Sequence, residues 1–194
     1  SDVNPYTHNL IHLGNKGFNL ATLTSESILV PPAFIITTEV FRCRDVVFGL
    51  SQARDEFMQQ VRRSLSEVEE QTGLQFGSAD NPLLLSVRSG CAISMPGMMA
   101  TVHNVGHNDE LITEYVAKYG NEYFAWDNYR RFLQSWAMIS GMEREDFQEL
   151  MNEAKSRYNV GFKREFSPYQ MKELALSYQK LIRQRGMGIP DDPW

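Results

Sequence analysis

The sequence contains no apolar run of the length that crosses a membrane, which argues against an integral membrane protein. It has only two cysteines, Cys43 and Cys91, among 194 residues, too few for a disulfide-framework domain. Basic residues are also in the minority: 19 Lys and Arg stand against 24 Asp and Glu, a formal net charge of −5. We therefore expect no membrane association and no general affinity for nucleic acid, which would require a basic face.

The chain begins with the polar residues Ser1-Asp2-Val3-Asn4-Pro5, which do not have the pattern of a secretory signal peptide. We accordingly expect a cytoplasmic protein, in which the two thiols are buried and unpaired. A hydrophobic content of 42% with 22% charged residues is typical of a soluble globular protein. The length suits one ordinary domain or two small ones.

The most informative stretch runs from Leu83 to Thr101. It starts as a short apolar segment after Asn81-Pro82, the pattern of a buried strand. Arg88 stands at the end of this predicted strand and is followed by Ser89-Gly90. A guanidinium beside small residues suits an anion such as phosphate, because glycine lets backbone N–H groups approach the oxygens. A salt-bridged surface arginine next to an ordinary turn explains the same residues, so both interpretations stay open at this point.

A second candidate phosphate contact lies near the start of the chain. Lys16 occurs in Leu13-Gly14-Asn15-Lys16-Gly17, a glycine turn that predicts a short helix continuing to Leu23. The free N–H groups and the dipole at a helix start favour anions. The segment lacks the full phosphate-loop pattern Gly-x-x-x-x-Gly-Lys-Ser/Thr. A solvated turn lysine is therefore the interpretation that these residues alone favour.

Two segments within 83–101 resemble a known protein family. Ser86-Val87-Arg88-Ser89-Gly90, followed by Ser94-Met95-Pro96-Gly97-Met98-Met99, closely resembles the nucleotide-binding domain of the pyruvate, phosphate dikinases. Phosphoenolpyruvate synthases share the Val-Arg-Ser core and differ beyond it. The dikinases also have a Gly-Gly-Lys-Gly-x-Asn-Leu segment whose lysine contacts ATP; Lys16 matches that lysine, with Asn15 in place of the second glycine. Similar runs at 30–34 and 124–132 extend the resemblance over essentially the whole chain.

The resemblance implies an α+β fold that is part of an ATP-grasp domain. Residues 1–105 would form its first α+β half, a small mixed sheet with helices. Residues 106–194 would form an all-helical subdomain, truncated at its C-terminal end because the family continues there with another helix. We therefore expect a fragment of a longer protein that is inactive alone.

The resemblance also implies a nucleotide site. Lys16 and Arg88 would contact the phosphates of ATP, with Arg88 as the catalytic residue of this chain. The remaining residues that would bind the nucleotide follow Arg88 in the sequence: Ser94, Met95, Pro96, Gly97, Met98, Met99 and Thr101. Ala100 departs from the family, which usually has aspartate there, and this puts catalytic competence in question.

The implied activity is that of the N-terminal ATP-binding fragment of such a dikinase. The parent enzyme converts ATP, pyruvate and phosphate to AMP, phosphoenolpyruvate and diphosphate, through a phosphohistidine on a domain absent here. Mg²⁺ would accompany ATP, with its acidic ligands beyond Trp194, so we expect no metal site in this chain. The expected partners are ATP, the phosphohistidine domain and, in the parent enzyme, a second subunit of a homodimer. The alternatives are a fragment of a phosphoenolpyruvate synthase-type dikinase and a non-catalytic dikinase-like nucleotide-binding module.

The remaining sequence predicts mostly helices. A β-branched strand is expected at 33–38 after Pro31-Pro32, and Ser167 is expected to cap the last helix. The predicted helices run from Thr38 through Val47 and over 51–71, 109–119, 122–139, 143–158 and 168 to about 186. One helix carries a core stripe of aromatic residues, namely Tyr123, Phe124, Trp126, Tyr129, Phe132 and Trp136.

Two smaller clusters have mainly structural interpretations. Asp127 with Arg130 or Arg131 offers surface ion pairs worth only tenths of a kcal/mol, roughly, at helical spacing. His103 and His107 lie four residues apart, a spacing that suits metal ligands on a helix. Gly106 between them argues against a helix there, so we expect no metal site from this pair.

Overall fold

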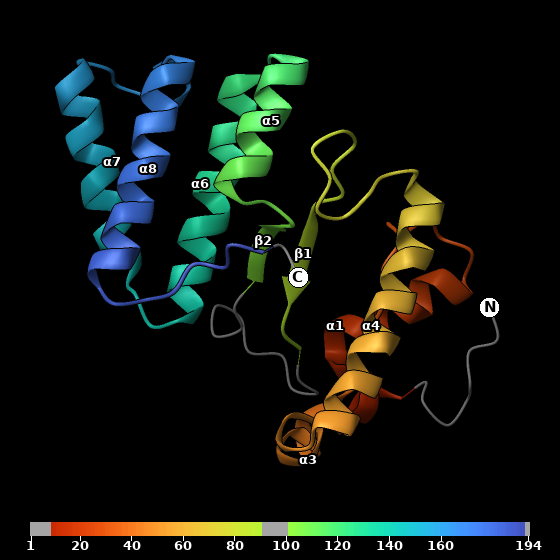
Figure 1. Ribbon diagram of the computed structural model, residues 1–194. Helices are drawn as coiled ribbons and strands as arrows, with labels where there is room; N and C mark the ends of the chain where they lie inside the picture. Colours follow the sequence, from red (N-terminus) through yellow and green to blue (C-terminus); the bar gives the residue numbers. More distant parts are fainter. Residues whose placement is uncertain (1–8, 91–100, 193–194) are drawn as a thin grey trace. The chain divides into compact units, whose positions relative to one another are not determined.

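The computed structural model describes residues 9–90 and 101–192, which divide into two compact units. The first unit contains residues 9–74 and 89–90, and the second contains residues 75–88 and 101–192. In these ranges the chain forms eight α-helices, one short 3-10 helix and two strands (Figure 1). The predicted α+β class is confirmed, although the described sheet is a two-stranded antiparallel hairpin rather than a mixed one. No helix in the described ranges combines the length and the apolar character that a bilayer span requires.

The first unit is helical, and its first helix is interrupted at Gly14. Helix α1 (Leu10–Ser25) begins at the cap Asn9, whose side chain accepts a hydrogen bond from the backbone N–H of His12. At Gly14 the backbone has φ 67° and ψ 166°, a conformation that only glycine adopts readily. The helix therefore restarts immediately before Lys16. This confirms the predicted glycine turn ahead of a helix.

Three predictions in the first unit are wrong. No strand forms at 33–38, because a strand needs a hydrogen-bonded neighbour and none of the described residues pairs with this segment. The helix predicted from Thr38 breaks at Cys43 into α2 (Thr38–Arg42) and α3 (Arg44–Gly49). Cys43 is exposed rather than buried, and Cys91 lies outside the described residues.

Helix α4 follows the prediction closely. It spans Ser51–Thr72 and ends at Gly73, which adopts a left-handed conformation with φ 69°. On its apolar face, Leu65 and Val68 are buried, whereas Phe57 and Val61 are half-buried. A glycine that follows a long amphipathic segment is thus sufficient to predict where this helix ends.

The second unit begins with a hairpin. Strand β1 (Leu85–Arg88) pairs antiparallel with β2 (Thr101–Val105), with Leu85 opposite Val105 and Arg88 opposite Thr101. The expectation of a buried strand is wrong, since the side chain of Val87 is 53% exposed. A sheet of two strands has too few neighbours to cover both faces. Strand β2 was not predicted.

Four α-helices follow the hairpin, at the predicted positions. They are α5 (Asp109–Tyr119), α6 (Glu122–Ile139), α7 (Arg144–Tyr158) and α8 (Pro168–Gln184), with the 3-10 helix η1 (Lys163–Glu165) before the last. Ser167 caps α8 as expected: its side chain accepts from the N–H of Gln170, and Pro168 occupies the first turn. The cap of α5 is Asn108, whose side chain accepts from the N–H of Leu111.

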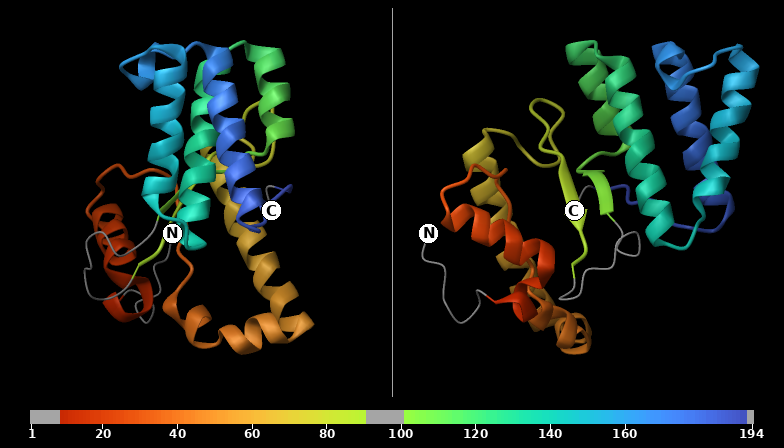
Figure 2. Two further views of the ribbon diagram at one scale, coloured as in Figure 1. Left: turned by 90° about the vertical axis from the view of Figure 1, so that its left-hand side faces the viewer. Right: turned by 180° about the vertical axis from the view of Figure 1, so that it is seen from behind.

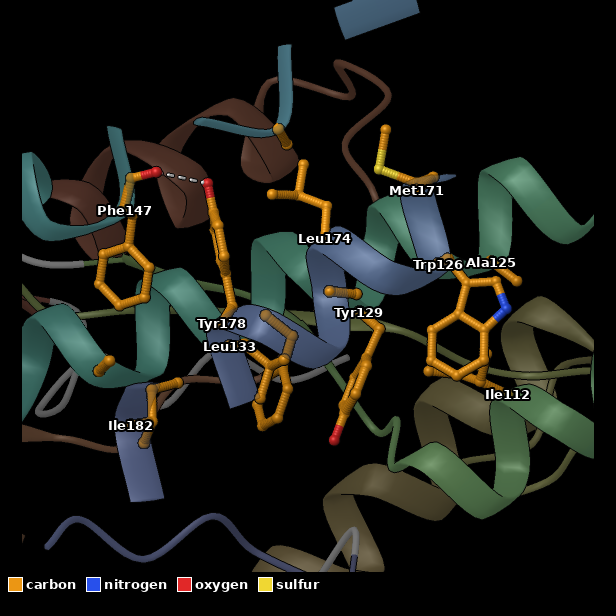
Figure 3. Packing of buried hydrophobic residues seen from close by; sticks show 14 of the residues in the cluster. Ile112, Ala125, Trp126, Tyr129, Leu133, Phe147, Met171, Leu174, Tyr178 and Ile182 are labelled. Atoms are coloured by element: carbon orange, nitrogen blue, oxygen red, sulfur yellow. Dashed lines mark hydrogen bonds between the residues drawn. The ribbon is translucent and has the colours of Figure 1, made fainter. Parts of the chain in front are cut away.

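Helix α6 is the centre of the second unit, where it packs against α5, α7, α8 and β2 (Figures 1 and 2). In the core the Tyr178 hydroxyl donates to the Phe147 carbonyl at 2.9 Å (Figure 3). Within the predicted aromatic stripe, Phe124 is 52% exposed, against expectation. The largest fully buried side chains come from all four helices: Tyr129, Tyr178, Phe147, Ile112, Leu133, Met171 and Ile182.

The junction between the hairpin and α5 depends on Gly106. Its φ is 117°, and a Cβ atom there would lie 2.8 Å from the Leu83 carbonyl oxygen and 2.9 Å from the Phe76 ring. Gly120 also has a positive φ, 71°, but has open space around it. We expect Gly106→Ala to lower the free energy of unfolding by about 1–3 kcal/mol more than Gly120→Ala, because only the first adds overpacking to backbone strain. Urea unfolding of both variants measures this difference, and equal losses would contradict the steric explanation.

Candidate functional site

Arg88 and Thr101 face each other at one end of the hairpin. Arg88 is the last residue of β1 and Thr101 the first of β2, and the two are direct partners in the ladder. Arg88 is exposed and forms no ion pair with any residue in the described ranges. Within the described ranges no carboxylate competes for its guanidinium, whose donors suit an external anion.

Lys16 lies in the first turn after the interruption of α1. Its Nζ atom donates to the backbone carbonyl of Ser89 at 3.0 Å, across 73 positions of the sequence. Ser89 directly follows Arg88 in the chain. Lys16 is half-buried and has no carboxylate partner in the part of the chain that the structure describes. Its ammonium group thus retains donors beyond the one bound to Ser89.

Glycine at position 17 allows the helix that carries Lys16 to approach the segment after Pro32. A Cβ atom at Gly17 would lie 3.1 Å from a terminal methyl carbon of Ile35. Any larger residue would have to displace that side chain. The two glycines near Lys16 are therefore required for different reasons. Gly14 is needed for its backbone conformation, and Gly17 is needed for close packing.

The structure describes only part of the predicted site. Arg88 lies opposite Thr101, and Lys16 contacts the residue after Arg88. The predicted nucleotide-binding loop, comprising Ser94, Met95, Pro96, Gly97, Met98 and Met99, lies outside the described residues, as does Ala100. The contact of Lys16 with the Ser89 carbonyl and the pairing of Arg88 with Thr101 were not indicated by the sequence pattern.

The two histidines do not share a helix. His103 lies in β2, exposed, with its Nδ1 atom 3.5 Å from the Ser86 hydroxyl oxygen. His107 follows the strand and is only 6% exposed. The expectation that no helix forms across Gly106 is confirmed. In the described ranges no three His, Cys, Asp or Glu side chains gather as metal ligands would.

Burial gives His107 a testable pH signature. Desolvation lowers the pKa of its imidazole from 6.5 to about 4, because burial disfavours the charged form. The unfolded chain therefore binds a proton that the folded chain does not, between pH 6.5 and about 4. We expect the free energy of unfolding to fall by about 3 kcal/mol as the pH is lowered through this window.

The control for this prediction is the exposed His103. Urea unfolding at a series of pH values should show a flattened pH dependence between 6.5 and 4 in His107→Gln. The same measurement on His103→Gln should reproduce the parent chain. An unchanged slope in His107→Gln would show that another group is responsible.

A buried charge cluster lies on α6. Asp127 is 7% exposed and accepts hydrogen bonds from Arg130 Nε at 3.0 Å and from Lys163 Nζ at 2.6 Å. Arg131 Nε lies 3.3 Å from the same carboxylate. The Arg130 guanidinium also lies 5.6 Å from the Tyr178 ring centroid. The prediction of weak surface pairs is therefore wrong, since this carboxylate and Arg130 are both buried.

Comparison with known proteins finds relatives along nearly the whole chain. A pyruvate, phosphate dikinase from Clostridium symbiosum is 34% identical over 184 residues, which are 93% of this chain and 21% of the relative. One from Entamoeba histolytica is 36% identical over 184 residues, 94% of this chain and 21% of the relative. The chloroplastic pyruvate, phosphate dikinase 1 of Arabidopsis thaliana is 37% identical over 183 residues, 93% of this chain and 19% of the relative.

These similarities cover most of this chain but little of the relatives. The chain spans about a fifth of the length of the curated relatives that it matches. No protein-family model matches the sequence.

Proposed function

Because the chain is related in sequence to the pyruvate, phosphate dikinases over nearly its whole length, we propose that it is the ATP-binding segment of such an enzyme. The segment would be the N-terminal part of an ATP-grasp domain, with residues 1–105 as its first α+β half and 106–194 as a helical subdomain. In the complete enzyme, ATP, pyruvate and phosphate would yield AMP, phosphoenolpyruvate and diphosphate. The phosphohistidine that carries the phosphoryl group would lie on a domain outside this chain.

The observation that carries the proposal is the placement of two cations. The exposed Arg88 ends β1 directly opposite Thr101, and Lys16 binds the carbonyl of the next residue, Ser89. Neither cation is neutralised by a carboxylate in the described ranges. A guanidinium fork and an ammonium group are donors that suit a polyphosphate, and the residues present therefore fit ATP.

The two cations would act by charge neutralisation. ATP would supply the phosphoryl group, and a phosphoryl-transfer site contributes mainly position and electrostatic stabilisation. Arg88 would bind two phosphate oxygens in a bidentate contact. Lys16 would provide a compact charge, while its bond to Ser89 aligns the backbone after Arg88. The loop from Ser94 to Met99 would complete the nucleotide contacts, and acidic Mg²⁺ ligands would come from outside the chain.

The proposal also includes predictions about the partners of this protein and its location in the cell. The phosphohistidine domain would be the protein partner, and the parent enzyme would be a homodimer. A cytoplasmic location is the prediction from the sequence, whereas the Arabidopsis relative is described as chloroplastic. Ala100 supports one alternative, a non-catalytic nucleotide-binding module, because the family has aspartate at that position.

Replacing Lys16 tests the nucleotide site. We expect Lys16→Met in the longer polypeptide to weaken ATP binding about 10- to 100-fold, the value of one charge-assisted hydrogen bond. Lys180→Met is the matched control, because Lys180 is exposed on α8 in the other unit. Isothermal titration with ATP measures both affinities. An unchanged affinity in Lys16→Met would remove Lys16 from the site.

A further inference from the structure

The hairpin of the second unit contains a β-bulge. The register between β1 and β2 (Figure 1) shifts by one residue between Leu85 and Val87. Two residues of β2, His103 and Asn104, therefore lie opposite the single residue Ser86 of β1. A bulge changes the direction of a side chain, and bulges are frequent next to active sites. The side chains at this bulge are therefore candidates for a functional role.

Two contacts with α6 hold the bulge in place. The backbone of Asn104 is left-handed, with φ 58°, a conformation that asparagine accepts more readily than most residues. Its side-chain amide donates to the backbone carbonyl of Asn128 at 3.1 Å. The backbone N–H of His103 donates to the hydroxyl of Ser135 at 3.0 Å. Because Asn128 and Ser135 both belong to α6, the backbone that carries the His103 side chain is anchored to the central helix of the unit.

The imidazole of His103 lies on the face of the hairpin that carries Arg88. Arg88 and Thr101 are direct partners in the ladder, and side chains two residues apart along a strand point to the same face. Ser86 and His103 are each two residues from this pair. The Ser86 hydroxyl oxygen lies 3.5 Å from His103 Nδ1, as expected for side chains on one face. This face therefore carries a guanidinium, an imidazole and two hydroxyl groups.

The two faces of the hairpin have different surroundings. Val102, on the other face, is 7% exposed and belongs to the hydrophobic core of the second unit. Arg88, Ser86 and His103 are exposed, and Thr101 is half-buried. Within the described ranges neither Arg88 nor His103 forms an ion pair with a carboxylate. One face thus stabilises the fold, whereas the other presents hydrogen-bond donors without a competing negative charge.

The spacing of these donors suits a chain of phosphate groups. Positions two residues apart along a strand are separated by about 6–7 Å, and directly opposite positions by about 5 Å. Three linked phosphate groups have a comparable length, so one triphosphate can contact Arg88 and His103 at the same time. Nδ1 of His103 lies next to the Ser86 hydroxyl. Nε2 is therefore the ring nitrogen that would donate to such a ligand.

We propose that His103 is a further contact to the phosphate chain of ATP. Arg88 would bind one phosphate group, and His103 Nε2 would donate to an oxygen of a neighbouring one. The inference rests on the proposed function, in which Arg88 belongs to the nucleotide site. It adds a binding residue on the second strand and gives the bulge a role, namely to hold the imidazole on the same face as Arg88.

Replacing His103 by leucine in the longer polypeptide tests the proposal. Leucine lacks a hydrogen-bond donor, and the side chain at this position is exposed, so the variant should unfold at the parent urea concentration. We expect the affinities for ATP and for tripolyphosphate to fall about tenfold, the lower value for a hydrogen bond to a charged group. The affinity for adenosine should not change. Competition against radiolabelled ATP measures all three, and an unchanged affinity for tripolyphosphate would overturn the proposal.

His103→Gln separates a lost donor from disturbed packing. Its side-chain amide can place an N–H group close to the position of the imidazole Nε2, so this variant should recover most of the affinity for tripolyphosphate that His103→Leu loses. An equal loss in both variants would contradict a donor role for His103.

Arg88→Ala distinguishes failure of this inference from failure of the proposed function. If Arg88→Ala weakens ATP binding and His103→Leu does not, the nucleotide site stands and His103 is not part of it. A parent polypeptide that binds neither ATP nor tripolyphosphate would refute both.

Discussion

Replacing Arg88 by alanine in the longer polypeptide is expected to reduce ATP-dependent histidine phosphorylation about 10²- to 10³-fold. The expectation follows from the loss of one preorganised cationic donor set at a phosphoryl-transfer site. Arg88 is exposed and pairs with no carboxylate in the described ranges, so the fold should be unaffected. Transfer of radiolabelled phosphate from ATP measures the rate.

The matched control for Arg88 is Arg144→Ala. Arg144 is an exposed arginine at the start of α7, so this variant removes an equal charge from a different surface. It should retain the parent rate, and both variants should unfold at the parent urea concentration. More than half of the parent activity in Arg88→Ala would remove Arg88 from the phosphate site.

Replacing Asp127 by alanine is expected to lower the free energy of unfolding by about 3–5 kcal/mol. The carboxylate is buried and accepts from Arg130 and Lys163. Its removal takes away the carboxylate next to the buried Arg130 guanidinium, whose other contacts among the described residues include Gln134, with Nη1 at 3.2 Å, and the Tyr178 ring. An uncompensated buried charge is one of the largest single destabilisations known.

The control for Asp127 is an exposed ion pair of the same unit. Asp80 pairs with Lys118, and their side chains are 71% and 50% exposed. Asp80→Ala should therefore cost less than about 1 kcal/mol. Urea unfolding measures both variants. A loss below 1 kcal/mol in Asp127→Ala would indicate that water or a rearranged side chain replaces the carboxylate.

The Asp127 cluster also predicts a loss of stability in acid. Burial alone would raise the pKa of Asp127, but the Lys163 hydrogen bond and the Arg130 charge more than offset it, so the pKa lies below its ordinary value. The stabilisation is therefore present above the ordinary carboxyl pKa of about 4 and is lost as the pH falls through the lower folded value. This window lies below that of His107, whose effect is complete near pH 4.

Helix positions were largely readable from the sequence because their signals are local. The Ser167-Pro168 start of α8 and the Gly73 end of α4 depend on residues within one turn. Elements that depend on distant neighbours were not readable. The β-branched segment at 33–38 has strand propensity without a partner, and β2 was missed because its pairing with β1 spans the loop between them.

The candidate site, too, could be predicted from the sequence only where its signals are local. Lys16 and Arg88 could be selected from residue type and flanking glycines, whereas the contact of Lys16 with Ser89 joins residues 73 positions apart. The burial of Asp127 was missed because helical spacing does not reveal which side of α6 is covered. Its partner Lys163 is 36 positions away. The aromatic residues around Asp127 were the available signal, since they lie on both sides of it in α6.

The most direct test of the account is phosphoenolpyruvate formation by the native polypeptide. An antibody against residues 106–192 would capture the protein from its source cells, and the captured protein would receive ATP, phosphate and pyruvate. We predict a polypeptide several times heavier than 22.3 kDa that releases AMP and phosphoenolpyruvate in equal amounts. A captured protein of 22.3 kDa that yields neither product would contradict the assignment to a dikinase.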